Sequence, residues 1–422
     1  MEDNLNTKKG KKKALINLIL SVAGIAFFNG IIQFVLYPFL DSKVGNAEFG
    51  LILTMISIMS IISSSAGTAV NNARMVAPFE KESKNGDYNF ILLLFNLIGI
   101  AVIIIFLFII NQLSWFNVVF LNILMFFTTY RYYSDCEFRK SLKFTSFFIY
   151  YLLIGIGYVL GCFLYYILPY WQLSMLLGEI LALLFVMIFG SIYKKPFLIS
   201  NQRKKVWILS TSLLIGEVIN NLILNSDRLL LYILVNDEAV TEYYIASLVG
   251  KIVALVTVPL NGVIIGYLSR QKKTPNKKFI LIYLFSVLGI GFLAFIGCLI
   301  ASPIFIKIFY PSSYDAVKNI IILAIIAQVA FFCSTLAMTL IIKYKHSYVQ
   351  LIINIVHIFI FIILASLGAY YGGLYGFAIS AMIGNLIRFI MISITALFIK
   401  PGIELVQNSK NQINETENKL DY

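Results

Sequence analysis

Long apolar segments alternate with short polar connections along most of the chain. Most of them hold about 20 or more residues, enough for a helix to cross the hydrocarbon core of a bilayer. Twelve such helices are predicted, at residues 14–40, 49–72, 88–110, 115–130, 144–168, 171–193, 206–235, 240–268, 279–305, 314–342, 347–370 and 374–399. We therefore expect an all-α, polytopic membrane protein, with the segment at 115–130 as a short fourth helix.

Composition and charge agree with a membrane protein. Hydrophobic residues make up 60% of the chain and charged residues 13%, a balance that soluble domains do not have. The formal net charge of +13 does not indicate a nucleic-acid partner, because the basic residues are spread through short connections. Of the 33 Lys and Arg residues, 27 lie before the first helix, in every second connection and in the tail. The connections between them hold only Lys43, Lys307 and Lys318. The positive-inside rule then places both termini in the cytoplasm, and the first helix is expected to be retained in the cell membrane.

The connection Lys194–Lys205 is the longest basic one near the centre of the chain. It suggests an N-terminal lobe at 1–197 with helices 1 to 6, a C-terminal lobe at 198–400 with helices 7 to 12, and a cytoplasmic tail at 401–422. Two halves that each begin and end on the same side of the membrane would be parallel repeats.

Charged residues inside the predicted helices point to a transport pathway. Glu217, Asp227 and Arg228 lie in the seventh helix, Lys251 in the eighth and Arg388 in the twelfth. A charge at membrane depth costs about 3 to more than 10 kcal/mol, so it normally faces a partner or a water-filled cavity. In a hairpin centred near residue 239, Asp227 and Lys251 lie at equal depth, which predicts that they pair.

Further polar residues extend this candidate cavity. Glu217 and Asp227 are interpreted as the only deep acids, and Arg131 as part of a cytoplasmic connection. The hydroxyl-rich stripe of the second helix can serve either helix packing or the cavity. The remaining candidate lining residues are Asn220, Asn221, Arg74, Asn71, Asn29 and Gln33.

Three features were interpreted mainly as packing. Gly157 and Gly161 form a G-x-x-x-G pair that favours close approach of another helix. Tyr158 is interpreted as a packing residue in preference to a platform for sugar rings. His357 is expected to be a hydrogen-bonded interior histidine in preference to a proton relay.

Four short stretches carry a family resemblance: Asn225–Arg228, Glu242–Ala246, Phe309–Ala316 and Gly373–Ala378. Together with the helix count they resemble the polysaccharide flippases of the Wzx type, in the superfamily that also holds lipid II flippases and multidrug extruders of the MATE type. The resemblance implies two six-helix lobes around a central cavity. It also implies alternating access that moves an undecaprenyl-pyrophosphate-linked oligosaccharide to the outer leaflet for surface polysaccharide synthesis. Family sites carry over only to Asp227 and Arg228.

The expected partners are the lipid-linked glycan, membrane lipids and a polysaccharide polymerase. Arg388 and Lys251 are predicted to hold the pyrophosphate. No extramembrane loop with paired acids, Walker sequence or metal-ligand cluster appears, so no enzyme activity, cofactor or metal site is expected. Two alternatives remain. One is a MATE-type drug or organic-cation antiporter that uses Glu217 and Asp227 as exchange carboxylates, and the other is a membrane-embedded enzyme of glycan assembly.

Overall fold

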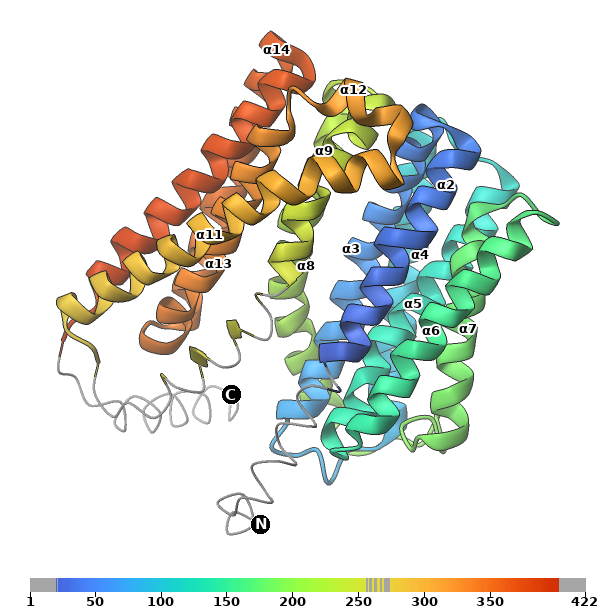
Figure 1. Ribbon diagram of the computed structural model, residues 1–422. Helices are drawn as coiled ribbons and strands as arrows, with labels where there is room; N and C mark the ends of the chain where they lie inside the picture. The colour runs from blue at the N-terminus through green and yellow to red at the C-terminus, as the bar shows by residue number, and fades with distance from the viewer. Residues whose placement is uncertain are drawn as a thin grey trace. The chain divides into compact units, whose positions relative to one another are not determined.

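The computed structural model describes residues 20, 22–255, 257, 260–261, 264–265, 268 and 274–401. All regular secondary structure in these residues is helical. The chain forms two compact units, Met1–Leu229 and Leu230–Tyr422, which Figure 1 shows from blue to green and from green to red. The lobe boundary expected at residue 197 stays a prediction.

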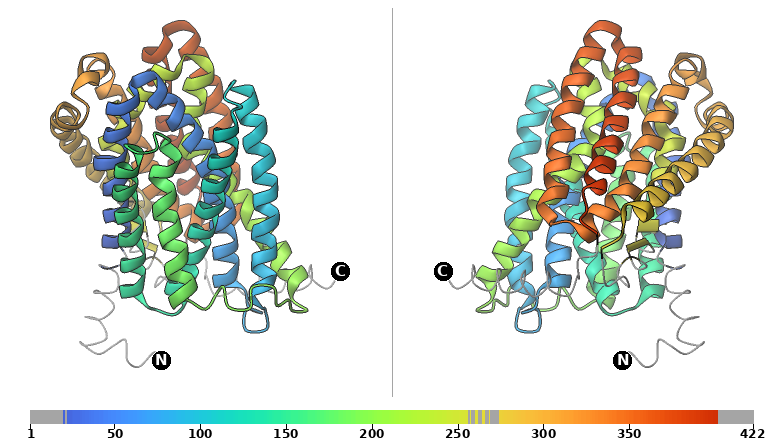
Figure 2. Two further views of the ribbon diagram at one scale, coloured as in Figure 1. Left: turned by 90° about the vertical axis from the view of Figure 1, so that its right-hand side faces the viewer. Right: turned by 90° about the vertical axis from the view of Figure 1, so that its left-hand side faces the viewer.

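Unit 1 is a bundle in which α3 packs against α4 and α5, and α6 packs against α7. Figure 2 shows these blue-to-green helices side by side. Its first span, Val22–Val44, contains the π-helical turn η1 (Ile32–Leu36) and α2 (Tyr37–Val44). The following helices are α3 (Asn46–Val76), α4 (Asn85–Ile109), α5 (Trp115–Lys140), α6 (Phe144–Tyr165), α7 (Trp171–Phe189) and most of α8 (Arg203–Leu234).

Unit 2 is built around α13, which packs against α9, α11 and α14. Its helices are α9 (Asp237–Leu255), α11 (Lys277–Phe309), the short turns η2 (Pro311–Ser313) and α12 (Tyr314–Val317), α13 (Ile321–Tyr344) and α14 (Ser347–Leu397). Helix α14 consists of two arms, because Gly372 and Gly373 have non-helical backbone angles. Gly373 has φ +52°, a conformation that glycine adopts without a Cβ clash.

Nine helices in the described residues are long and apolar enough to cross a membrane. One of these, Tyr348–Leu397, contains two predicted segments, and α5 and α9 account for the remaining two. The outer faces of α4 and α11 carry exposed side chains such as Leu97, Phe285 and Leu293, as expected for contact with lipid. The all-α polytopic fold class is therefore confirmed. Part of the predicted eighth helix, 240–268, lies outside the described residues.

The predicted end of the fourth helix at residue 130 is wrong. Helix α5 continues to Lys140, and Arg131, Asp135 and Glu137 are buried in its last turns. Each of these charged side chains is satisfied by a partner from another helix or connection, so the helix does not need to end where charge begins.

Candidate functional site

Three side-chain hydrogen bonds join α3 to α8 within unit 1. Arg228 Nη1 donates to Ser57 Oγ at 3.3 Å, and Asn221 Nδ2 donates to Ser65 Oγ at 3.1 Å. Asn72 Nδ2 donates to Glu217 Oε1 at 3.2 Å. We call these three pairs the α3–α8 hydrogen-bond row. The residue numbers rise along α3 as they fall along α8, so the two helices run antiparallel.

The row brings together three of the predicted site residues, Glu217, Asn221 and Arg228. Their partners on α3 are Ser57, Ser65 and Asn72. The hydroxyl-rich stripe of the sequence includes Ser57 and continues to Asn72, but it contains Ser64 where the structure has Ser65. The Arg228 side chain also hydrogen-bonds Tyr37 of α2. Polar groups that would be costly in lipid are thus satisfied between neighbouring helices.

Other predicted site residues of unit 1 lie outside the row. Asn71 donates to the backbone oxygen of Tyr132 on α5 at 2.8 Å. Asn29 donates to the oxygen of Ile25 in its own helix at 2.9 Å. Asn220 and Gln33 are half-buried, and Gln33 lies in the π-helical turn η1, a feature that is frequent at functional sites.

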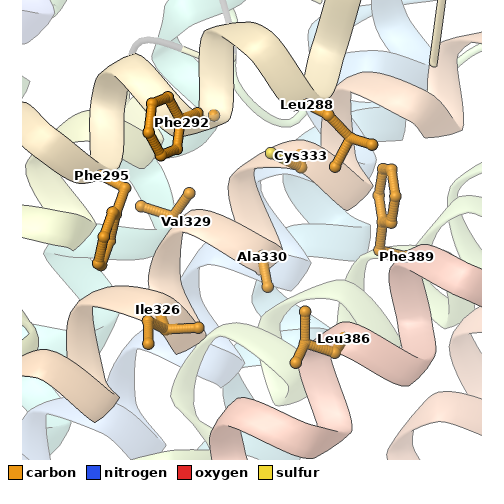
Figure 3. A pocket seen from close by; sticks show the side chains of 10 residues that line it. Leu288, Phe292, Phe295, Ile326, Val329, Ala330, Cys333, Leu386 and Phe389 are labelled. Carbon is orange, nitrogen blue, oxygen red and sulfur yellow. The ribbon is translucent and has the colours of Figure 1, made fainter. Parts of the chain in front are cut away.

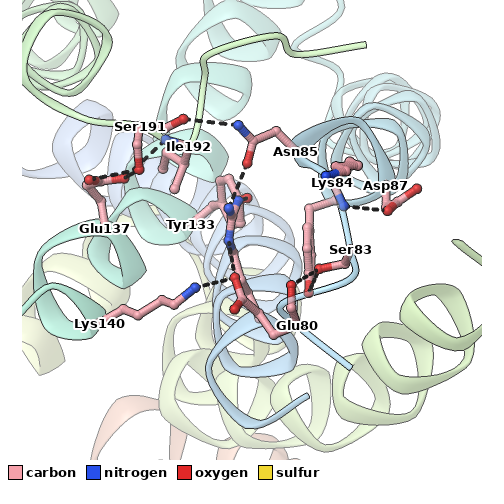
Figure 4. A network of polar contacts seen from close by, with 12 residues as sticks. Glu80, Ser83, Lys84, Asn85, Asp87, Tyr133, Glu137, Lys140, Ser191 and Ile192 are labelled. Carbon is pink, nitrogen blue, oxygen red and sulfur yellow. Dashed lines mark hydrogen bonds and ion pairs between the residues drawn. The ribbon is translucent and has the colours of Figure 1, made fainter. Parts of the chain in front are cut away.

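Arg74 belongs to a polar network at the predicted cytoplasmic end of unit 1. Figure 4 shows this network around Tyr133, Asn85 and Glu80. Arg74 donates to the Tyr133 hydroxyl, and to Asn85 Oδ1 at 2.6 Å. Its guanidinium also lies over the Tyr88 ring, with Cζ 4.8 Å from the centroid. Arg74 thus joins α3, α4 and α5. Its guanidinium holds these helices together and is not a free cation.

The same network holds the connection between α7 and α8. Glu137 Oε2 accepts hydrogen bonds from Ile192 N at 3.1 Å and Ser191 Oγ at 3.0 Å. At the other end of the connection, the Asp87 carboxylate accepts from Ser200 N and Ser200 Oγ. Burial raises the pKa of the Tyr193 hydroxyl well above its usual value, so this side chain stays neutral. The connection is therefore fixed to unit 1 along much of its length.

A buried ion pair in unit 1 corrects the sequence interpretation. Arg131 Nε lies 2.9 Å from Glu179 Oε2, and the Glu179 side chain is 0% exposed. The Tyr158 hydroxyl donates to Glu179 Oε1 at 2.6 Å, which confirms Tyr158 as an interior packing residue. Arg131 also lies over the Tyr132 ring, with Cζ 4.2 Å from the centroid. The expectation that Glu217 and Asp227 are the only deep acids is wrong, and so is the placement of Arg131 in a cytoplasmic connection.

The sequence held a signal for this pair. Glu179 lies in the middle of an apolar segment, at a depth where a lone carboxylate requires a partner. Arg131 directly follows the assigned end of the fourth helix. If this helix continues beyond residue 130, Arg131 lies within the helix and not in a connection. Both observations together would have indicated the pair.

The two charges of the predicted hairpin fall in different units. Asp227 is in unit 1, where its Oδ1 accepts from the backbone nitrogen of Arg228 at 2.9 Å. Lys251 is in unit 2, with its Nζ 5.4 Å from the centroid of the Tyr244 ring. Their pairing stays a prediction.

Arg388 lies inside unit 2 and is only 6% exposed. Its Nη2 donates to Asn354 Oδ1 at 3.4 Å, and its Cζ lies 4.5 Å from the centroid of Phe331. His357 is buried close to Arg388, so its interior position is confirmed, but the expected hydrogen bond is not, because Nδ1 and Nε2 have no hydrogen-bond partner among the described residues. This cluster joins α13 to both arms of α14.

Unit 2 also contains an apolar cavity of about 460 Å³ between α11, α13 and the second arm of α14. Figure 3 shows Phe292, Val329 and Phe389 directed into it. Of the ten lining residues, only Cys333 has a polar side-chain group, its thiol, and none is charged. The cavity therefore does not suit a phosphate or a sugar. No group of three His, Cys, Asp or Glu side chains in the described residues could hold a metal ion.

Comparisons with solved structures place the fold. An inward-facing multidrug-resistance MATE family transporter of the MOP superfamily superposes with a TM-score of 0.61 at 12% identity, over 90% of this chain and 93% of that one. An outward-facing structure of a MATE family transporter of the same superfamily gives 0.57 at 15% identity, over 92% and 94%. The Vibrio cholerae MATE transporter VcmN in its bent form gives 0.55 at 13% identity, over 92% and 96%. No protein-family model and no curated protein sequence matches the chain. The chain has the fold of MOP-superfamily transporters.

Proposed function

We propose that this protein is a flippase that moves undecaprenyl-pyrophosphate-linked oligosaccharide from the cytoplasmic to the outer leaflet for surface polysaccharide synthesis. The observation that carries the proposal is the chemistry of the α3–α8 hydrogen-bond row. It consists of hydroxyls, amides, one guanidinium and one carboxylate, and that carboxylate accepts a hydrogen bond from Asn72. Such groups match a cargo rich in hydroxyls with an anionic head.

The proposed mechanism is alternating access, in which the row opens to receive the cargo. The neutral Asn221–Ser65 bond contributes about 1 kcal/mol net and each of the two bonds to a charged group about 1.5–3 kcal/mol, because water or sugar hydroxyls can replace the partner. Separation of α3 from α8 therefore costs little when a glycan takes over the same donors and acceptors. Arg228 supplies positive charge for the pyrophosphate, and the lipid tail stays in the bilayer. A polysaccharide polymerase would receive the product.

A MATE-type drug or organic-cation antiporter is the second candidate, because the fold is shared with MATE transporters. Such a pump needs a free carboxylate that exchanges a proton for a lipophilic cation. Glu179 is a fully buried acid, but Arg131 neutralises it and Tyr158 donates to it. Glu217 is hydrogen-bonded in the row. This arrangement favours an anionic, hydroxyl-rich cargo over a cationic one, and a membrane enzyme of glycan assembly has less support than either transporter.

Deletion of the gene in its native host tests the proposal. The strain should lose surface polysaccharide and accumulate undecaprenyl-linked repeat units on the cytoplasmic side, with unchanged sensitivity to ethidium. Expression of the intact chain from a plasmid should restore the polysaccharide. Normal polysaccharide together with hypersensitivity to ethidium would reverse the assignment in favour of drug extrusion.

A further inference from the structure

Arg388 has fewer partners than a buried arginine requires. It lies in the second arm of α14, in contact with Asn354 and the Phe331 ring. Its Nε and Nη1 atoms have no hydrogen-bond partner among the described residues. A guanidinium is always charged in proteins and carries five N–H donors, so a counter-charge is needed at this depth.

The second half of the sequence does not supply a carboxylate for this purpose. Between Glu242 and Glu404 the chain contains one acid, Asp315. That residue is 87% exposed and pairs with Lys318 at 3.0 Å. The positions of the predicted eighth helix that the structure leaves out contain no Asp or Glu either. The contacts that α13 and the first arm of α14 make with Arg388 are therefore with neutral groups.

The neighbours of Arg388 are suited to a small anion. Asn354 is 3% exposed, His357 2% and Asn385 7%, so the group is closed to a bulky ligand. An asparagine amide and one nitrogen of a neutral histidine can each donate a hydrogen bond. The Phe331 ring covers the guanidinium on one side. The two unpaired N–H-bearing atoms of a guanidinium that is 6% exposed and covered by a ring suit an ion much smaller than a glycosyl pyrophosphate.

We propose that Arg388, together with Asn354 and His357, holds a small monovalent inorganic anion inside unit 2, with chloride as the physiological occupant. The anion neutralises the guanidinium and accepts its unpaired N–H groups. This site is separate from the α3–α8 hydrogen-bond row, and its existence does not depend on which cargo the protein moves. The alternative source of negative charge is the pyrophosphate of the cargo, as the sequence had suggested for Arg388.

The test measures the thermal unfolding midpoint of the purified full-length protein in detergent at constant ionic strength. Replacement of sodium gluconate by sodium chloride or bromide should raise the midpoint by about 2–4 °C and saturate, because a ligand that binds only the folded state stabilises it. Arg388→Gln should abolish this dependence, whereas Lys307→Gln, which removes an exposed cation of the same unit, should keep it.

A second variant keeps the test decisive if Arg388→Gln does not fold. Asn354→Asp places a carboxylate where the Asn354 oxygen now lies, 3.4 Å from Arg388 Nη2. It should remain stable in gluconate and lose its response to chloride. Equal midpoints of the wild type in gluconate and chloride would overturn the proposal, and so would an Asn354→Asp variant that responds to chloride as the wild type does. A rise with inorganic pyrophosphate but not with chloride would also overturn it and assign Arg388 to the cargo headgroup.

Discussion

Arg131 and Glu179 show how single residues depend on distant parts of the chain. Each is a charge that the membrane interior would reject alone, and each becomes tolerable because the other lies 2.9 Å away. Tyr158 completes the group by donating to Glu179. Neutralised in this way, Glu179 contributes to the structure of unit 1 and is not available as an exchange carboxylate.

We expect single replacements in this pair to be more harmful than the double replacement. Arg131→Met or Glu179→Gln alone leaves a buried charge unpaired, which costs about 3–5 kcal/mol. The double variant removes both charges and should recover much of that stability. Thermal unfolding of the purified variants measures the difference. Asp315→Asn, which breaks an exposed pair, is the control and should change the stability by less than about 1 kcal/mol. Single variants that unfold at the wild-type temperature would contradict the assignment.

Helices α6 and α7 illustrate how a sequence pattern becomes a helix contact. A Cβ atom added at Gly157 would lie 2.7 Å from the backbone nitrogen of Gly178, closer than real Cβ contacts. The neighbour is backbone, which cannot move aside as a flexible side chain can. The G-x-x-x-G interpretation of Gly157 and Gly161 is therefore confirmed.

Gly157→Ala should consequently destabilise the protein by about 1–3 kcal/mol, the usual cost of overpacking. Gly289→Ala is the matched control, because Gly289 is an α11 residue with open space around its Cα. There the higher helix propensity of alanine should stabilise the protein by up to about 1 kcal/mol. Thermal unfolding should thus show opposite signs for the two variants. A lower midpoint for both, or for neither, would refute the packing argument.

The α3–α8 hydrogen-bond row makes a prediction about motion between helices. Cysteines at Ser65 and Asn221, joined by a short bis-methanethiosulfonate reagent, should hold α3 and α8 together and stop transport until the link is reduced. The native Cys136, Cys162, Cys298 and Cys333 are buried to a similar extent as Ser65 and Asn221, so they are first replaced by alanine to leave the introduced pair as the reactive thiols. Ser63 bonds to the Met59 oxygen of its own helix, so a Ser63 and Asn221 cysteine pair is the unlinked control. Full polysaccharide production by linked protein would show that the row does not open.

The sequence predicted the helices better than the partners of their polar residues. Runs of apolar residues are long and regular, so most segment limits lie within a few residues of the observed ones. Helix α5 was cut short because Arg131, Asp135 and Glu137 resemble loop charges when their partners, such as Glu179 and Ser191, are far away in sequence. The polar face of α8 was predicted from its charges, but its partners depend on the rotation of α3. Ser57 and Asn72 belong to the stripe read from the sequence, whereas Ser65 differs from the predicted Ser64 by one residue.

At the level of the whole molecule, the fold is that of MOP-superfamily transporters, and the sequence identity to MATE transporters is low. The fold alone does not specify the cargo, so the polar residues are the evidence for it. The described interior of unit 1 contains hydroxyls, amides and charged side chains, of which Arg131 and Glu179 neutralise each other. The cavity of unit 2 is apolar, and its buried cation, Arg388, lies among neutral side chains. Only the polar groups of unit 1 support the proposed hydroxyl-rich, anionic cargo, because the apolar cavity of unit 2 offers it no hydrogen-bonding partner.

Glycan translocation by the purified protein is the most direct measurement. The full-length chain would be reconstituted into vesicles with a fluorescent undecaprenyl-pyrophosphate-linked oligosaccharide, and access of an external quencher to the label would be followed. In protein-free vesicles only the outer-leaflet half of the label, about 50% by geometry, should be quenched, whereas the protein should make nearly all of it accessible. When the Ser65 and Asn221 cysteine pair is linked, about half of the label should again be protected from the quencher, as in protein-free vesicles. A protected fraction that the wild-type protein leaves unchanged, together with proton-coupled uptake of ethidium in the same vesicles, would contradict the flippase assignment.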